Sequence, residues 1–433
     1  MKNKRMLTKT VSILTVGVMC VSAAFLAGCG SKENASEEAS NAAEAVQNAA
    51  AEMTEGTDPE GSIADGINNA IGEFAESAAG LEPITPVPVT VTPTPEPTPE
   101  PEPVSVNFLC VGDNLIHSSL IQCGLGMGGD WNYMYDPIRG YIEEADVATI
   151  NQETMLVDDP NEYGGYPQFG TPYGVGDATI NAGFDVFTCA TNHSLDKGGY
   201  GIDCTVAYYE SHGMPYTGIQ NSATASYDIP YTIIERNGIR FALLNFTYDT
   251  NGYPFPDGCP YMVHTFDDEA QIRADLAAAD ADSDCIIVFA HWGDEYSQYV
   301  NDFQFYWANV FYECGVNVVV GGHPHVVEPY EMKTDGVGHD MLVYYSLGNF
   351  VSNQTDVEDL VGGMARFTIT KTGDKVAVTA YSMDPVATHT TGELYSQAYM
   401  LADYSQDLCD QNLYVGSVDQ LWNIYNDYTT WQQ

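Results

Sequence analysis

The sequence has very little positive charge. It contains 14 Lys and Arg against 60 Asp and Glu over 433 residues, so its formal net charge at pH 7 is -46. Four of the basic residues lie within the first ten positions, which makes the remainder still more acidic. A protein that binds nucleic acid neutralises phosphates with a basic face. The composition therefore excludes a conventional nucleic-acid binder.

Segments that could build a packed core are missing from the first hundred residues. Residues 30–80 are rich in Ala, Glu, Ser and Asn, and residues 81–103 form a Pro-rich run. These compositions are typical of a mobile tether and of an extended polyproline spacer, respectively. We therefore expect a linker over 29–103, one α/β domain over 104–385, and a C-terminal extension over 386–433 packed on that domain.

Charge is absent from residues 11–27, an apolar run that follows a basic head. This pattern is typical of a secretory signal, although the run is also close to the lower length limit of a transmembrane helix. The run ends in Leu26-Ala27-Gly28-Cys29, which resembles a bacterial lipobox. We therefore expect a signal peptide over 1–28, lipidation at Cys29, and attachment to the extracytoplasmic face of the bacterial cell membrane.

No Cys-x-x-Cys pair occurs among the ten cysteines, which argues against a zinc–thiolate site. Eight cysteines remain after the predicted signal and the lipidated Cys29 are set aside. Export permits disulfides. Cys110, Cys189 and Cys285 lie inside apolar runs, however, where they fit equally well as small buried hydrophobic residues.

Short apolar runs alternate with helix-like segments over the rest of the chain. Continuous apolarity indicates strands buried on both faces. The expected strands are 104–111, 146–150, 185–190, 240–246, 285–290, 316–320 and 341–345, and the expected helices are 200–211, 267–280 and 303–314. Turn signals at Asn237-Gly238 and Thr372-Gly373-Asp374 add two hairpins. The pattern predicts an α/β fold with mixed sheets flanked by helices.

Side chains that can bind metal follow five of these strands. The carboxyl ends of strands in open α/β sheets form the crevice where ligands bind. We therefore expect these side chains to converge at one site, and they are Asp113, Glu153, Asn192 with His193, His291, and the pair His323 and His325.

Each of these residues has a structural alternative. Gly112-Asp113 is a common turn pair, Asn192-His193-Ser194 fits a helix cap, and His291 fits a core histidine. His323-Pro324-His325 is the strongest single signal, because two imidazoles around a proline make a poor structural element and good ligands. Four of the nine histidines lie at predicted strand ends, which favours a common site.

Six ordered motifs resemble the CapA/PgsA-type poly-γ-glutamate capsule proteins, whose fold is similar to that of the calcineurin-like metallophosphoesterases. The resemblance covers residues 104–385. The motifs are Gly112-Asp113-Asn114-Leu115, Asn151-Gln152-Glu153, Asn192-His193-Ser194-Leu195-Asp196, His291-Trp292-Gly293, Gly322-His323-Pro324-His325-Val326 and Tyr345-Ser346-Leu347-Gly348-Asn349-Phe350.

The resemblance implies one or two divalent metal ions. Asp113 and His325 would bind one ion, a second set would bind the other, and Glu153 would bridge them. The second set would be Asn192, His291 and His323. Carboxylate, amide and imidazole ligands suit Mn²⁺, Fe or Zn²⁺. The resemblance also implies that His193 acts as a general acid and that Asp196 orients it.

The substrate must be attracted locally, because a polyanionic protein repels anions at long range. Lys197, just past the Asn-His motif, is a candidate substrate contact or a solvated loop charge. His117 is a second candidate substrate contact. In the ordinary phosphoesterase pattern, Asp-x-His, the histidine lies two residues after the aspartate, whereas His117 lies four residues after Asp113.

The resemblance implies a membrane-tethered extracytoplasmic protein that acts, with a metal, in the biosynthesis of poly-γ-glutamate or a related anionic surface polymer. Membrane polymer synthetase subunits would be its partners. One alternative is a metal-dependent phosphodiesterase or phosphatase acting on exported phosphate esters. The other is a non-catalytic module that holds polymer or organises the synthetase.

Overall fold

The computed structural model describes residues 102–431, apart from 335, 337–338 and 393–394. The predicted signal peptide, the lipidation site at Cys29 and nearly all of the predicted linker lie outside these residues. Among the helices that are described, none has the length and apolar character needed to cross a membrane.

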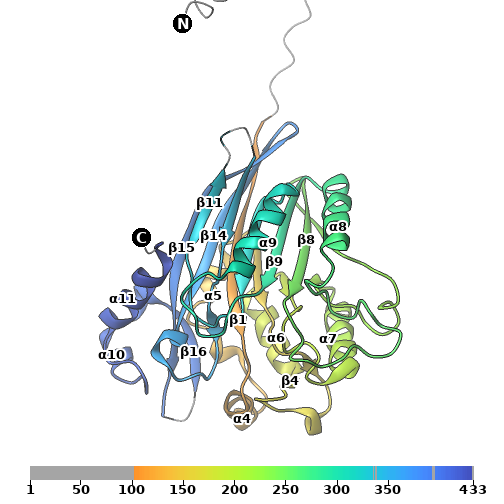
Figure 1. Cartoon of the computed structure of the whole chain (residues 1–433). Helices are drawn as coiled ribbons and strands as arrows, with labels where there is room; N and C mark the ends of the chain where they lie inside the picture. The colour runs from red at the N-terminus through yellow and green to blue at the C-terminus, as the bar shows by residue number, and fades with distance from the viewer. Residues whose placement is uncertain (1–101, 335, 337–338, 393–394, 432–433) are drawn as a thin grey trace, which may run out of the picture. The chain divides into compact units, whose positions relative to one another are not determined.

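The first sheet has the strand order β16-β15-β14-β1-β2-β5-β6, with β13 also paired to β1. Figure 1 labels β1, β14, β15 and β16 of this sheet. Four neighbouring strands are parallel, and β14, β15 and β16 add antiparallel pairs. The bounds are β1 (Val104–Asn114), β2 (Val147–Asn151), β5 (Val186–Thr188), β6 (Tyr216–Thr217), β13 (Asn349–Val351), β14 (Val361–Thr372), β15 (Lys375–Thr390) and β16 (Ser396–Met400).

The second sheet has the order β11-β12-β10-β9-β8-β7, with a parallel centre and an antiparallel strand at each edge. Its strands are β7 (Thr232–Arg236), β8 (Ile239–Thr247), β9 (Cys285–His291), β10 (Val318–Gly322), β11 (Tyr330–Thr334) and β12 (Asp340–Tyr344). A separate small sheet pairs β3 (Leu156–Val157) with β4 (Thr171–Pro172).

Helices flank the two sheets. The α-helices are α4 (Ser118–Gly126), α5 (Arg139–Glu143), α6 (Tyr173–Ala182), α7 (Gly198–His212), α8 (Glu269–Asp282), α9 (Asp302–Glu313), α10 (Gln406–Cys409) and α11 (Val418–Thr429). Short 3-10 turns are η2 (Asn132–Met134), η3 (Pro160–Glu162), η4 (Val357–Leu360) and η5 (Leu401–Asp403). A capping box between Asn301 and Gln304 fixes the start of α9.

Alternation along β1 shows how the layers form. Phe108 and Cys110 point into the core between the two sheets, whereas Leu109 and Val111 pack against the core beneath α4 to α7. A third core lies between the second sheet and helices α8 and α9. Phe108 packs edge-on against Phe241 of β8 in the second sheet, with ring centroids 4.9 Å apart. The sheets therefore pack face to face, with helices on their outer faces.

The predicted fold class is confirmed, and the predicted strands and helices are present with ends shifted by up to three residues. Both predicted hairpins are present, as β7–β8 and β14–β15. All eight cysteines of the described residues are free, and Cys110, Cys189 and Cys285 are buried. Strand β15 continues past residue 385, the expected end of the α/β domain. In the predicted C-terminal extension, α11 contributes Leu421 and Ile424 to the core between the sheets.

Candidate metal centre

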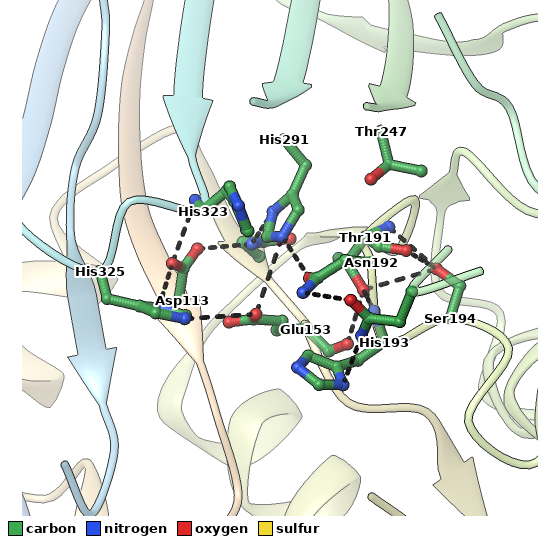
Figure 2. A network of polar contacts seen from close by, with 12 residues as sticks. Asp113, Glu153, Thr191, Asn192, His193, Ser194, Thr247, His291, His323 and His325 are labelled. Carbon is green, nitrogen blue, oxygen red and sulfur yellow. Dashed lines mark hydrogen bonds and ion pairs between the residues drawn. The ribbon is translucent and has the colours of Figure 1, made fainter. Parts of the chain in front are cut away.

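Residues from four strand ends of the two sheets meet at one place (Figure 2). Asp113 lies near the end of β1, and Glu153 follows β2 by two residues. His291 ends β9, and the loop after β10 carries His323 and His325. The parallel strands of both sheets present their carboxyl ends here, as expected for a ligand site in an α/β fold. The topology of the two sheets therefore brings these residues together, although they lie far apart in the sequence.

One group of potential ligands consists of Asp113, Glu153 and His325, all fully buried. His325 Nδ1 lies 3.0 Å from Asp113 Oδ2, and His325 Nε2 lies 3.9 Å from Glu153 Oε1. Asn151 donates a hydrogen bond of 2.7 Å to Asp113 Oδ1, so the carboxylate is held in place. One ligand atom from each of the three residues lies within 4.8 Å of the others.

A second group consists of Glu153, His291 and His323 and meets the same distance limit. His291 Nε2 lies 3.7 Å from Glu153 Oε1 and 2.9 Å from Asn192 Oδ1. Glu153 belongs to both groups, so its carboxylate lies between two sets of ligands. We call the six residues Asp113, Glu153, Asn192, His291, His323 and His325 the metal cradle.

The cradle contains buried polar atoms that lack a hydrogen-bond partner. Both carboxylate oxygens of Glu153 and Nδ1 of His323 are buried without a hydrogen bond. Burying a carboxylate unpaired costs several kcal/mol, so a fold keeps one only where something compensates. Carboxylate, amide and imidazole donors suit divalent Mn, Fe or Zn. The residues present therefore fit one or two divalent ions.

Protonation in the cradle follows from burial and from the neighbouring charges. Burial and the Asp113 carboxylate raise the pKa of Glu153 well above its usual value. Burial opposes protonation of His325, but Glu153 and Asp113 outweigh it and raise its pKa to about 9. Burial and the neighbouring imidazoles lower the pKa of His291 and His323 well below the usual range. These two imidazoles are therefore neutral and ready to bind a metal.

The backbone of the His-Pro-His loop is strained. His323 and His325 have φ values of 96° and 64°, in the left-handed region that non-glycine residues rarely adopt. Gly322 precedes them, and a Cβ there would lie 2.7 Å from Asp113 Oδ1. The loop therefore approaches the Asp113 carboxylate closely, and its strained backbone places both imidazoles next to the other cradle residues.

His193 and Asp196 form a buried pair beside the cradle. His193 Nδ1 lies 2.8 Å from Asp196 Oδ2, which also accepts the backbone N–H of Phe169 at 2.8 Å. The loop is fixed by Ser194, whose hydroxyl accepts from Thr191 N–H and donates to Cys189 O, both at 2.8 Å. The hydrogen bond to Asp196 leaves Nε2 of His193 free to exchange a proton.

The two predicted substrate contacts lie outside the cradle. Lys197 Nζ lies 3.5 Å from Glu162 Oε2, and its side chain is 15% exposed under the segment before β4. His117 is half-buried just before α4, and its ring packs edge-on against Phe169. The structure thus brings together the six predicted ligands and the pair of His193 and Asp196, with His117 near that pair.

Three asparagines that the sequence reasoning did not assign also contact site residues. Asn349 Oδ1 lies 3.1 Å from His325 Nδ1, and Asn151 Nδ2 lies 3.3 Å from His291 Nδ1. Asn251, with φ of 53°, contacts Asn192 at 3.4 Å. Asn349 and Asn151 lie within recognisable motifs, so their positions were a usable signal. Asn251 lies in a loop whose sequence gives no such signal.

Comparison with known proteins gives matches in sequence and in structure. The family model of bacterial capsule synthesis protein PGA_cap matches residues 107–354, more than half of the chain. The PGA biosynthesis protein CapA of Bacillus subtilis is 30% identical over 192 residues, covering 44% of this chain and 48% of that protein. The capsule biosynthesis protein CapA of Bacillus anthracis is 26% identical over 239 residues, covering 52% and 54%. The chain thus spans about half the length of these relatives.

Two solved structures are similar at low identity. The calcineurin-like phosphoesterase YfkN from Bacillus subtilis has a TM-score of 0.40 and 14% identity, covering 76% of this chain and 97% of that chain. The NAD nucleotidase NadN of Haemophilus influenzae has a TM-score of 0.41 and 12% identity, covering 76% and 60%.

Proposed function

The chain belongs to the bacterial capsule synthesis protein PGA_cap family, and from this premise we propose that it is a metal-dependent hydrolase or transferase. It would act in the production of poly-γ-glutamate or a related anionic surface polymer. The observation that carries the proposal is the buried Glu153 carboxylate, which lacks a hydrogen-bond partner and lies between two sets of potential ligands. Such a group is costly to bury, which supports a role for it as a ligand.

The cradle residues have separate roles in this proposal. Asp113 and His325 would bind one divalent ion, Asn192, His291 and His323 the other, and Glu153 both. When bound, the ions supply Lewis-acid polarisation and neutralise charge that develops on the reacting group. His193 would first take up a proton from solvent on Nε2 and then hand it to the leaving group, and Asp196 would hold its Nδ1 proton.

A panel of substrates tests this function. We would assay the Mn²⁺-loaded protein and the variant His193→Ala against poly-γ-glutamate, a phosphodiester and a phosphomonoester. Cleavage or transfer of the polymer, lost in the variant with metal content unchanged, is the expected result. Turnover of phosphate esters alone would replace the proposal with an exported phosphoesterase. Polymer binding without any turnover would replace it with a non-catalytic module.

We also propose that the protein is anchored through lipidated Cys29 at the extracytoplasmic face of the cell membrane. The support is the sequence alone, in which a lipobox-like tetrapeptide ends an apolar run and a long linker follows. Cys29→Ser should abolish incorporation of a labelled fatty acid. Equal labelling of the wild type and the variant would contradict the anchor without affecting the metal-centre proposal.

A further inference from the structure

Two imidazoles of the site pack against the same aromatic ring. The ring centroid of Phe169 lies 4.7 Å from that of His193, at an interplanar angle of 78°, and 5.3 Å from that of His117, at 85°. His117 lies just after β1, the strand that carries Asp113. One shared contact therefore holds both histidines against the same ring, and His193 is adjacent in sequence to Asn192 of the cradle.

The segment that carries Phe169 is tied down next to each histidine. The Phe169 N–H donates to Asp196, the partner of His193. The Gly165 N–H donates to the hydroxyl of Ser118, the residue after His117, at 2.9 Å. The spacing of the two imidazoles is therefore built into the fold and does not depend on a mobile side chain.

The hydrogen bonds of the two rings assign them different tautomers. His193 donates from Nδ1 to the Asp196 carboxylate, so its Nε2 has a lone pair. His117 Nδ1 lies 3.2 Å from the backbone nitrogen of Asn353 and 3.1 Å from the Leu115 carbonyl. A backbone N–H cannot be turned away, whereas an imidazole can place its proton on either nitrogen. We infer that Nδ1 of His117 accepts from Asn353, which places the hydrogen on Nε2 and leaves the Leu115 carbonyl without a donor from this ring.

The ring of His117 is held in the neutral form. Its pKa is lowered to about 4, mainly by burial; the contact with the Leu115 carbonyl opposes this, and His325 and His193 lower the pKa further. Its Nε2 is therefore a hydrogen-bond donor across the working pH range and carries no charge. Neutral donors matter here, because no Lys or Arg of the described chain forms an ion pair with a cradle residue.

We propose that His117 is a second imidazole of the active site, which donates its Nε2 hydrogen to an oxyanion of the substrate held at the cradle. The ligand chemistry is a phosphate or carboxylate group. His117 would stabilise this oxyanion while His193 exchanges a proton with the leaving group. This inference rests on the proposed metal-dependent function and adds the residue that contacts the substrate's charged group.

The test compares the full-length wild type with His117→Ala, His117→Gln and the control His212→Ala. His212 lies at the end of α7 with a side chain 41% exposed. Histidine-selective ¹⁵N NMR should show His117 protonated at Nε2 only. In the Mn²⁺-loaded protein, titration calorimetry should show inorganic phosphate bound about tenfold more weakly by His117→Ala, since one hydrogen bond is lost. His117→Gln should recover most of the affinity, because its amide is also a donor, and His212→Ala should match the wild type.

Three results would overturn the proposal. These are a proton on Nδ1 of His117, wild-type phosphate affinity in His117→Ala, or loss of metal from both His117 variants, which would make the residue structural. Neither NMR nor phosphate binding depends on turnover. A wild-type protein that turns over nothing but shows the expected tautomer and phosphate effect would contradict the enzymatic proposal and support the role of His117.

Discussion

Among the described residues, two buried polar clusters that contain histidine differ in their hydrogen bonding: the cradle, and a cluster around His389. In the cradle, His323 Nδ1 and both oxygens of Glu153 have no hydrogen-bond partner, and the backbone at His323 is strained. At the other cluster, His389 Nδ1 pairs with the Tyr404 hydroxyl at 2.8 Å, and Asn412 donates to that hydroxyl at 3.0 Å. Burial of a histidine therefore does not indicate function by itself. A functional site is indicated by the combination of missing hydrogen-bond partners, nearby carboxylates and a strained backbone.

The largest expected effect concerns Glu153, which both ligand groups share. Glu153→Gln should lower metal affinity at least a hundredfold, because a neutral amide replaces the only carboxylate common to the two groups. In metal-free protein at neutral pH the same change should raise the free energy of unfolding by about 1–3 kcal/mol. Burial raises the pKa of Glu153, so folding requires this group to take up a proton, and glutamine does not have this cost. Metal titration and urea denaturation measure these two effects, and unchanged metal binding would place the ions elsewhere.

The next effect concerns Asp196, which lies in neither ligand group. Asp196→Asn should keep the metal and lower turnover by about 10²–10⁴-fold, because His193 loses the acceptor that fixes its Nδ1 proton. The matched control is Asp177→Asn, which alters an exposed histidine–carboxylate pair with His212. Steady-state kinetics and elemental analysis would measure the turnover and the metal content of both variants. Equal losses of turnover in the two variants would refute a specific role for Asp196.

A smaller effect is expected at the satisfied cluster. His389→Ala should leave metal content unchanged and lower the free energy of unfolding by about 2–3 kcal/mol, through a lost hydrogen bond and a small cavity. Burial lowers the pKa of His389, so the unfolded chain takes up the proton first. Wild-type stability should therefore fall as the pH drops below about 6.5, and the variant should lose part of this dependence. Urea denaturation at several pH values provides the measurement, and loss of metal from His389→Ala would contradict the distinction between the clusters.

The smallest effect is expected at Glu328, a buried carboxyl group that accepts a hydrogen bond of 2.6 Å from Gln304. Burial raises its pKa to about 8 from an ordinary 4.5, although the bond from Gln304 opposes this. The unfolded chain ionises first as the pH rises, so wild-type stability should decline between pH 5 and pH 8. Glu328→Gln should flatten that decline by about 1–2 kcal/mol, as denaturation at both pH values would show. An identical decline in the variant would mean that another group causes it.

The sequence allowed the fold and the ligand set to be predicted for different physical reasons. Continuous apolar runs identified the central strands because parallel strands are buried on both faces. The ligands followed from those runs, since polar residues at strand ends converge in this topology. Asn251 could not be found in this way, because its contact with Asn192 depends on a loop conformation. The shared contact of His117 and His193 with Phe169 was also out of reach, since it depends on how the segment before β4 packs.

The most direct test of the central claim is anomalous diffraction from crystals of the Mn²⁺-loaded protein. We predict two anomalous peaks per chain, one among Asp113, Glu153 and His325, and one among Glu153, His291 and His323. The Glu153→Gln variant, crystallised in the same way, should show neither peak at comparable height. Wild-type crystals without a peak inside the cradle, or a variant that keeps both, would contradict the account.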